Sequence, residues 1–223
     1  GQAGRLRACV FVGTMAFNMQ DVLLEPYGGE ILGLSVSATT LLTALWAAGA
    51  LCGFAWAGRR LARGSNSYRL AGGGILAGVW AFTLVIFAAP MQANFLFYAG
   101  ATLIGFGGGL FAVSTLTAAM TMPAKGVGGR VVALVAVWAA QATAAGVAIA
   151  LGGTLRDWIG AIAMSGVWGE GLQTPAAGYA FVYHAEIGLL FVTLIILGPL
   201  VRHSGPPTEK EEPQPLGLAD FPT

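Results

Sequence analysis

Charged residues are scarce in this sequence. Of its 223 residues only 9% are charged, whereas soluble domains average about 25%. Hydrophobic residues make up 56% of the chain, and they gather in long runs. A chain with so little charge does not cover itself with a polar surface in water. The composition therefore excludes an ordinary soluble domain and predicts an all-α membrane protein.

Cysteines and enzyme motifs are also few or missing. The two cysteines, Cys9 and Cys52, have no second cysteine or histidine at metal-ligand spacing, so we expect small apolar core residues and neither a disulfide nor a metal site. The chain lacks the HExxH, GxSxG and Walker patterns. Its basic residues lack interleaved aromatic residues, apart from Tyr68 beside Arg69, which argues against nucleic-acid binding. The sequence therefore lacks these soluble-enzyme signatures, and we expect no nucleic-acid partner.

Glycine, by contrast, is abundant, with 34 residues that lie mostly inside the apolar runs. Several glycines are four positions apart, a spacing that puts two small residues on one face of a helix and lets a neighbouring helix approach closely. These pairs are Gly49/Gly53, Gly74/Gly78 and Gly105/Gly109. The pattern predicts tightly packed membrane helices.

The apolar runs predict six transmembrane helices, because about 20 apolar residues cross a bilayer core of ~30 Å. The predicted spans are residues 8–24, 37–58, 70–90, 94–122, 131–155 and 179–201. Residues 156–178, with Trp158 and Trp168, are predicted to lie on the outer membrane surface. Residues 1–202 then form one transmembrane domain, and the proline-rich residues 203–223 a flexible cytoplasmic tail.

The basic residues predict the orientation of these spans. With six spans, ten of the 11 Lys and Arg residues lie on one side of the membrane, and Arg156 alone lies on the other. Because basic loops stay in the cytoplasm, both termini are predicted to be cytoplasmic. The end of the first span that carries Asp21 and Glu25 then faces outward.

A polar stripe on the first predicted span is the first candidate site. Thr14, Asn18, Asp21 and Glu25 recur at spacings that place them on one face of a helix. Carboxylates in membrane spans are rare and are candidates for binding or proton-linked sites. The alternative is a capped helix end whose acids lie in interfacial water.

The fifth and sixth spans add further polar candidates. His184 and Glu186 are two positions apart, so one should face the bundle when the other faces outward. His184 is a candidate ligand for a metal such as the magnesium of a chlorin, or a histidine hydrogen-bonded inside the bundle. Gln141, near the middle of the fifth span, is predicted to form an interhelical hydrogen bond.

Two resemblances follow from these patterns. Six helices with a basic loop after the second span resemble one half of a major facilitator transporter, and the Gly53–Arg60 segment is similar to a degenerate copy of that superfamily's loop motif. More specifically, the chain resembles the bacteriochlorophyll delivery family, the PucC/LhaA-like proteins of purple phototrophic bacteria. The segments that carry this likeness are MQDVLLEPYGGE at 19–30, LGLS at 32–35, ATT at 38–40, QATAAG at 141–146, Arg156-Asp157, YHAEIGLLF at 183–191 and LGLADFP at 216–222.

The resemblance implies a non-enzymatic factor for assembly of light-harvesting antenna, located in the intracytoplasmic photosynthetic membrane. Such a factor delivers bacteriochlorophyll, bound or carried transiently, or chaperones antenna polypeptides. The implied partners are these polypeptides, the reaction centre–antenna complex, the lipid membrane and an N-terminal six-helix half of the same protein. Two alternatives remain: a secondary transporter of a small solute, coupled to protons through Asp21 and Glu25, and a permanent structural subunit of a photosynthetic complex.

Overall fold

Helices make up the regular structure throughout the part of the chain described by the computed structural model, residues 1–122 and 126–203. The predicted tail beyond residue 203 and the loop around Lys125 lie outside these described residues. The elements in chain order are α1 (Gln2–Asn18), η1 (Met19–Val22), α2 (Leu24–Glu30), α3 (Val36–Ala62), α4 (Ser67–Ala88), α5 (Asn94–Met120), α6 (Gly126–Met164), η2 (Glu170–Leu172) and α7 (Ala176–His203).

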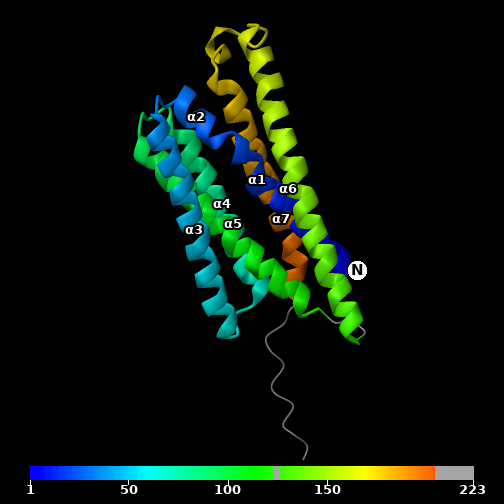
Figure 1. Cartoon of the computed structure of the whole chain (residues 1–223). Coiled ribbons are helices and arrows are strands. Elements are labelled where there is room, and N and C mark those ends of the chain that lie inside the picture. Colours follow the sequence, from blue (N-terminus) through cyan, green and yellow to red (C-terminus); the bar gives the residue numbers. More distant parts are fainter. Residues whose placement is uncertain (123–125, 204–223) are drawn as a thin grey trace, which may run out of the picture.

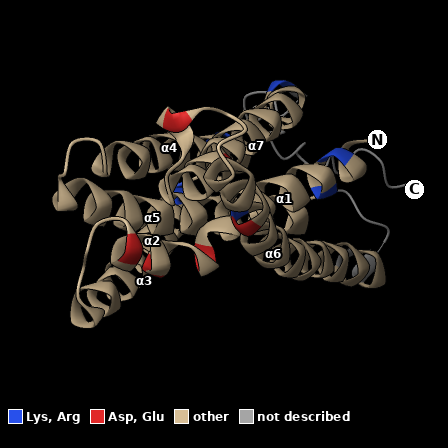
Figure 2. Cartoon of the chain, turned by 90° about the horizontal axis from the view of Figure 1, so that it is seen from above, with Lys and Arg blue, Asp and Glu red and all other residues tan. Residues whose placement is uncertain are grey.

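Five of these helices, α3 to α7, are long and apolar enough to cross a membrane. The chain is therefore an all-α, multi-pass membrane protein, as its composition predicts. Figure 2 shows how little of the ribbon is charged. α1 has 17 residues and includes Arg5 and Arg7, so it does not reach a span's length by itself. The sixth crossing and the orientation of the termini stay predictions.

The first helix ends earlier than the sequence predicts. The predicted helix over residues 8–24 is wrong, because α1 stops at Asn18 and a separate helix, α2, begins at Leu24. The amide Nδ2 of Asn18 donates to the Thr14 carbonyl at 2.6 Å, and Nε2 of Gln20 donates to the Phe17 carbonyl at 3.2 Å. Both side chains thus bond to backbone carbonyls near the end of α1, and Phe17 is among the last four residues, whose carbonyls lack a partner within the helix. Pro26 has no N–H for the carbonyl of Val22, so the first helix does not continue through this point.

α6 is much longer than the predicted fifth span. It has 39 residues, or about 58 Å at 1.5 Å per residue, well beyond a bilayer core. The prediction of a separate surface element from residue 156 is therefore wrong as far as Met164. The charges at Arg156 and Asp157 do not end the helix, because Arg156 bonds to Asp157 and to Glu30.

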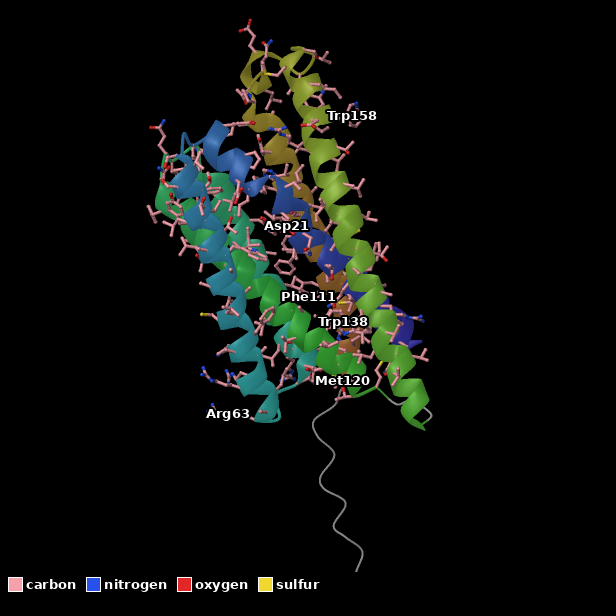
Figure 3. The ribbon with its side chains drawn as sticks, viewed as in Figure 1. Asp21, Arg63, Phe111, Met120, Trp138 and Trp158 are labelled. Atoms are coloured by element: carbon pink, nitrogen blue, oxygen red, sulfur yellow. The ribbon has the colours of Figure 1, made fainter. Side chains whose placement is uncertain are left out.

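The helices form two groups that pack side by side (Figure 1). In one group α5 lies against α3 and α4, and in the other α7 lies against α1 and α6. Contacts of α4 with α7 and of α1 with α5 join the groups. Figure 3 shows Arg63 and Met120 at one end of the bundle and Trp158 at the other. We call the second end, which carries Glu25, Glu30, Asp157 and Glu170, the acidic end.

Glycines bring the helices into backbone contact, which confirms the packing predicted from their spacing. A Cβ atom at Gly49 or Gly53 would overlap backbone carbonyls of α5, at Thr102 and Phe106 respectively. A Cβ at Gly74 would lie 2.7 Å from the carbonyl oxygen of Gly107. Because a real Cβ atom does not come this close to backbone atoms, these positions of α3 and α4 approach the α5 backbone only because they are glycine.

Candidate functional site

A cavity of about 380 Å³ lies between α1, α3, α5 and α6, and we call it the lateral cavity. Its walls combine aromatic side chains with glycine backbone. Trp46 and Trp138 are both exposed in part, and Phe111 and Trp138 line the part of the cavity between the level of Asp21 and the end that carries Met120 (Figure 3). The other lining residues are Thr14, Phe17, Asn18, Ala50, Phe54, Ile104, Gly105, Gly108, Gly109, Ala112, Gln141, Ala142 and Ala145.

Polar groups line part of this cavity. Thr14 and Asn18 enter it from α1, and Gln141 enters it from α6. Nδ2 of Asn18 is used within α1, so its carbonyl oxygen remains for a ligand. The interhelical hydrogen bond predicted for Gln141 is absent among the described residues, because the helix contributing Gln141 faces open space at this level. The Gln141 amide is therefore available inside the cavity.

A second cavity of about 350 Å³ opens toward the acidic end, and we call it the acidic-end cavity. Asp21 and Glu25 line it, and the Thr43 hydroxyl donates a hydrogen bond to Glu25. Trp46 lines both cavities. The four residues of the predicted polar stripe thus divide between two neighbouring cavities, because the helix is interrupted between Asn18 and Leu24.

His184 and Glu186 face opposite sides of α7, as their spacing predicts. Glu186 is 0% exposed, while His184 is exposed. Nδ1 of His184 donates to the Ala180 carbonyl at 2.7 Å. Neither residue lines the lateral or the acidic-end cavity, so the structure does not bring them together with Gln141 or Thr14.

A polar network at the acidic end was not predicted from the sequence. Arg156 forms an ion pair with Glu30 at 2.9 Å, and its guanidinium also donates to the Tyr179 hydroxyl. The Tyr179 hydroxyl in turn donates to Glu30 at 2.7 Å, and the guanidinium lies 4.5 Å from the Tyr179 ring centre. The network ties α2, α6 and α7 together beside η1. The sequence does show that Arg156 is an isolated basic residue on the side of the membrane that carries acidic residues, which indicates an ion pair. It does not identify the partner, because Glu30 is 126 positions away.

We expect Arg156→Gln to lower the stability of this end of the bundle by about 1 kcal/mol. The effect is modest because the pair is partly exposed, and Tyr179 keeps its bond to Glu30. Thermal unfolding in detergent measures it, with Arg63→Gln at the opposite end as the control. Equal unfolding temperatures for the two variants would show that the network adds no stability.

Comparison with known proteins places this sequence in a family. The sequence profile described as PUCC protein matches residues 1–205. The chain is 52% identical over 221 residues to "Uncharacterized protein in puhA-bchM intergenic region" of Rhodobacter capsulatus, covering 98% of this chain and 46% of that protein. It is 46% identical over 192 residues to "Protein PucC" of Cereibacter sphaeroides, covering 86% and 40%.

A more distant relative is named after the synthesis of a pigment. The chain is 29% identical over 152 residues to "Bacteriochlorophyll synthase 44.5 kDa chain" of Rhodobacter capsulatus, covering 65% of this chain and 34% of that protein. The chain thus spans less than half the length of these relatives. No solved structure matches it. With a family profile that covers nearly its whole length, the chain belongs to the PUCC protein family.

Proposed function

We propose that this chain is an assembly factor for light-harvesting antenna in the membrane of a phototrophic bacterium, and that it is not an enzyme. Its cargo is bacteriochlorophyll, or an antenna polypeptide that receives the pigment. Family membership supports the proposal, together with one relative named for a bacteriochlorophyll synthase chain and another named for the puhA-bchM intergenic region.

The observation that carries the proposal is the lateral cavity and the side on which it opens. The apolar segments of α3 and α6 are poorly covered by other helices. Only 17% of the apolar segment of α6 and 28% of that of α3 are buried inside the bundle, whereas 50% of that of α5 is buried. α3 and α6 both line the cavity, so it lies beside weakly covered apolar helices. Cargo dissolved in the bilayer therefore reaches it without crossing water.

The lining suits a flat apolar molecule with a few carbonyl groups. Trp46 and Trp138 offer aromatic faces, and Gly108 on α5 adds no side chain to the cavity wall. The free amide of Gln141 donates to a carbonyl of the cargo, which fixes orientation in an otherwise apolar cavity. Chlorin pigments combine a flat ring with such carbonyls.

The open face also suits the predicted N-terminal half. The relatives are more than twice as long as the part that this chain matches. In a protein of that length, we expect a second helical bundle to pack against the exposed sides of α3 and α6 and to close the lateral cavity there.

A bulky residue in the lateral cavity provides the test. The variant Ala142→Trp fills the cavity from α6, and Ala150→Trp adds the same bulk at an exposed position of the same helix that does not line the cavity. Each is purified in mild detergent from phototrophic membranes, and bacteriochlorophyll absorption and antenna polypeptides are measured per chain. We expect about a tenfold loss of cargo for Ala142→Trp, equivalent to ~1.4 kcal/mol of binding, and none for Ala150→Trp.

Two results would contradict the proposal. A colourless wild-type protein without antenna polypeptides would favour the secondary transporter. Stoichiometric recovery with mature reaction centres, unchanged in Ala142→Trp, would identify a permanent structural subunit.

A further inference from the structure

Buried polar atoms without hydrogen-bond partners gather at one place in the described residues, where η1 meets α7. Such atoms are rare because each one loses its water without compensation. The side-chain atoms in this state are Gln20 Oε1, Tyr183 OH, Glu186 Oε1, Glu186 Oε2 and, elsewhere, Ser114 Oγ. Gln20 is 1% exposed, and Tyr183 and Glu186 are each 0% exposed. Three neighbouring side chains thus hold all but one of these atoms.

These side chains interact with one another and with Asp21. The Glu186 carboxyl interacts electrostatically with the peptide N–H of Gln20, with the Asp21 carboxyl and with the Tyr183 hydroxyl. Nε2 of Gln20 donates to Oδ1 of Asp21 at 2.6 Å. Its amide nitrogen is therefore occupied, and its oxygen Oε1 still needs a donor.

No lysine, arginine or histidine in the described residues is among the groups that act on Glu186. From η1 the facing charged group is Asp21. Tyr27 of α2 lies edge-on to Tyr183 with ring centres 5.4 Å apart, and Tyr179 lies one turn earlier on α7. From α4 the neighbour is the apolar Phe82, 6.3 Å from Tyr183. Arg156 of α6 does not neutralise Glu186, because its guanidinium is bonded to Glu30, Asp157 and Tyr179.

Counting donors and acceptors distinguishes the two forms of Glu186. With Glu186 ionised, the cluster has three acceptor atoms, Gln20 Oε1 and both carboxylate oxygens, and two donors, the Tyr183 hydroxyl and the peptide N–H of Gln20. With one proton on Glu186, the acid O–H is a third donor, and the acceptors are Gln20 Oε1 and the acid carbonyl oxygen. The neutral acid therefore offers a donor for each acceptor, and the ionised form leaves at least one buried acceptor without a donor.

We propose that Gln20, Tyr183 and Glu186 form a buried proton-binding site. Glu186 is a neutral carboxylic acid that donates to Oε1 of Gln20, and the Tyr183 hydroxyl acts on it without forming a hydrogen bond. Two carboxyl groups that act on each other in an apolar interior do not both hold a negative charge without a cation. Asp21 takes the charge, because it is exposed in the acidic-end cavity and accepts from Nε2 of Gln20.

The site connects the bundle interior with the acidic-end cavity through a single amide. The Gln20 side chain donates to Asp21 through its nitrogen, and in the proposed neutral form its oxygen accepts from Glu186. A change of charge at either carboxyl group then alters the hydrogen bonding of the other. This inference concerns the face of η1 toward α7 and does not depend on the cargo proposed above.

Infrared spectroscopy of the full chain in detergent tests the site at pH 7. Only a protonated carboxyl group gives the high-frequency carbonyl band that shifts in D₂O. We expect this band in the wild type, its complete loss in Glu186→Gln and no change in Glu25→Gln, which removes an exposed carboxyl group at the neighbouring cavity. Tyr183→Phe is expected to shift the band and keep it, because it removes a buried hydroxyl dipole that acts on Glu186 and not the proton.

Three outcomes would overturn the proposal. The first is a wild type without the band, and the second is a band that survives in Glu186→Gln. The third is a wild-type band that disappears on addition of Na⁺ at constant pH, which would show that the oxygens hold an alkali cation. If Glu186→Gln does not fold, the wild-type spectrum and the Tyr183→Phe shift still decide the question.

Discussion

Replacing Gly105 with alanine is expected to destabilise the bundle by about 3 kcal/mol, a large part of the stability of a typical domain. The new Cβ would overlap the carbonyl oxygen of Trp46 and lie 2.9 Å from the amide nitrogen of Ala50. Both atoms belong to the backbone of α3, so no side-chain rotation relieves the overlap. α3 and α5 must move apart, and the contacts along their whole length weaken.

Gly108→Ala is the matched control, because it changes the same helix by the same methyl group. The Cβ at Gly108 would lie 3.5 Å from the Phe17 ring, an ordinary contact with a side chain. Denaturant unfolding in detergent compares the two variants. Equal stability would contradict the direct backbone contact between α3 and α5.

Gly152→Ala is expected to have the second large effect, about 2–3 kcal/mol, and to displace η1. A Cβ at Gly152 would overlap the carbonyl oxygen of Met19 and lie 3.1 Å from its carbonyl carbon. Met19 begins the η1 turn that carries Gln20 and Asp21. We therefore expect both a lower unfolding temperature and a lower recovery of bacteriochlorophyll with the purified chain.

The adjacent glycine supplies the control for this prediction. A Cβ at Gly153 would meet only a methyl group of Val22, at 3.8 Å, so Gly153→Ala should behave as the wild type. A Gly152→Ala protein that unfolds and retains cargo like Gly153→Ala would show that η1 does not rest on α6 at this point.

Local features of the chain were predictable to within a few residues. Four helices, α3, α4, α5 and α7, lie close to the predicted spans at 37–58, 70–90, 94–122 and 179–201. The reason is that the length of an apolar run can be read directly from the sequence. Glycine spacing predicted the close contacts of α3 and α4 with α5. The alternation along α7 predicted that Glu186 and His184 face opposite sides, since helical periodicity depends only on neighbouring positions.

The sequence by itself thus determined the membrane character of the chain, most of its spans and its family. The tertiary structure alone decided the break after Asn18, the length of α6 and the position of Glu186 against Gln20. It also decided the division of the polar stripe between two cavities and the pairing of Glu30 with Arg156. The physical reason is the same in each case. These features depend on which backbone and side-chain groups form hydrogen bonds and contacts across large sequence separations. Periodicity and composition describe neighbouring positions and average content, so they do not identify these distant partners.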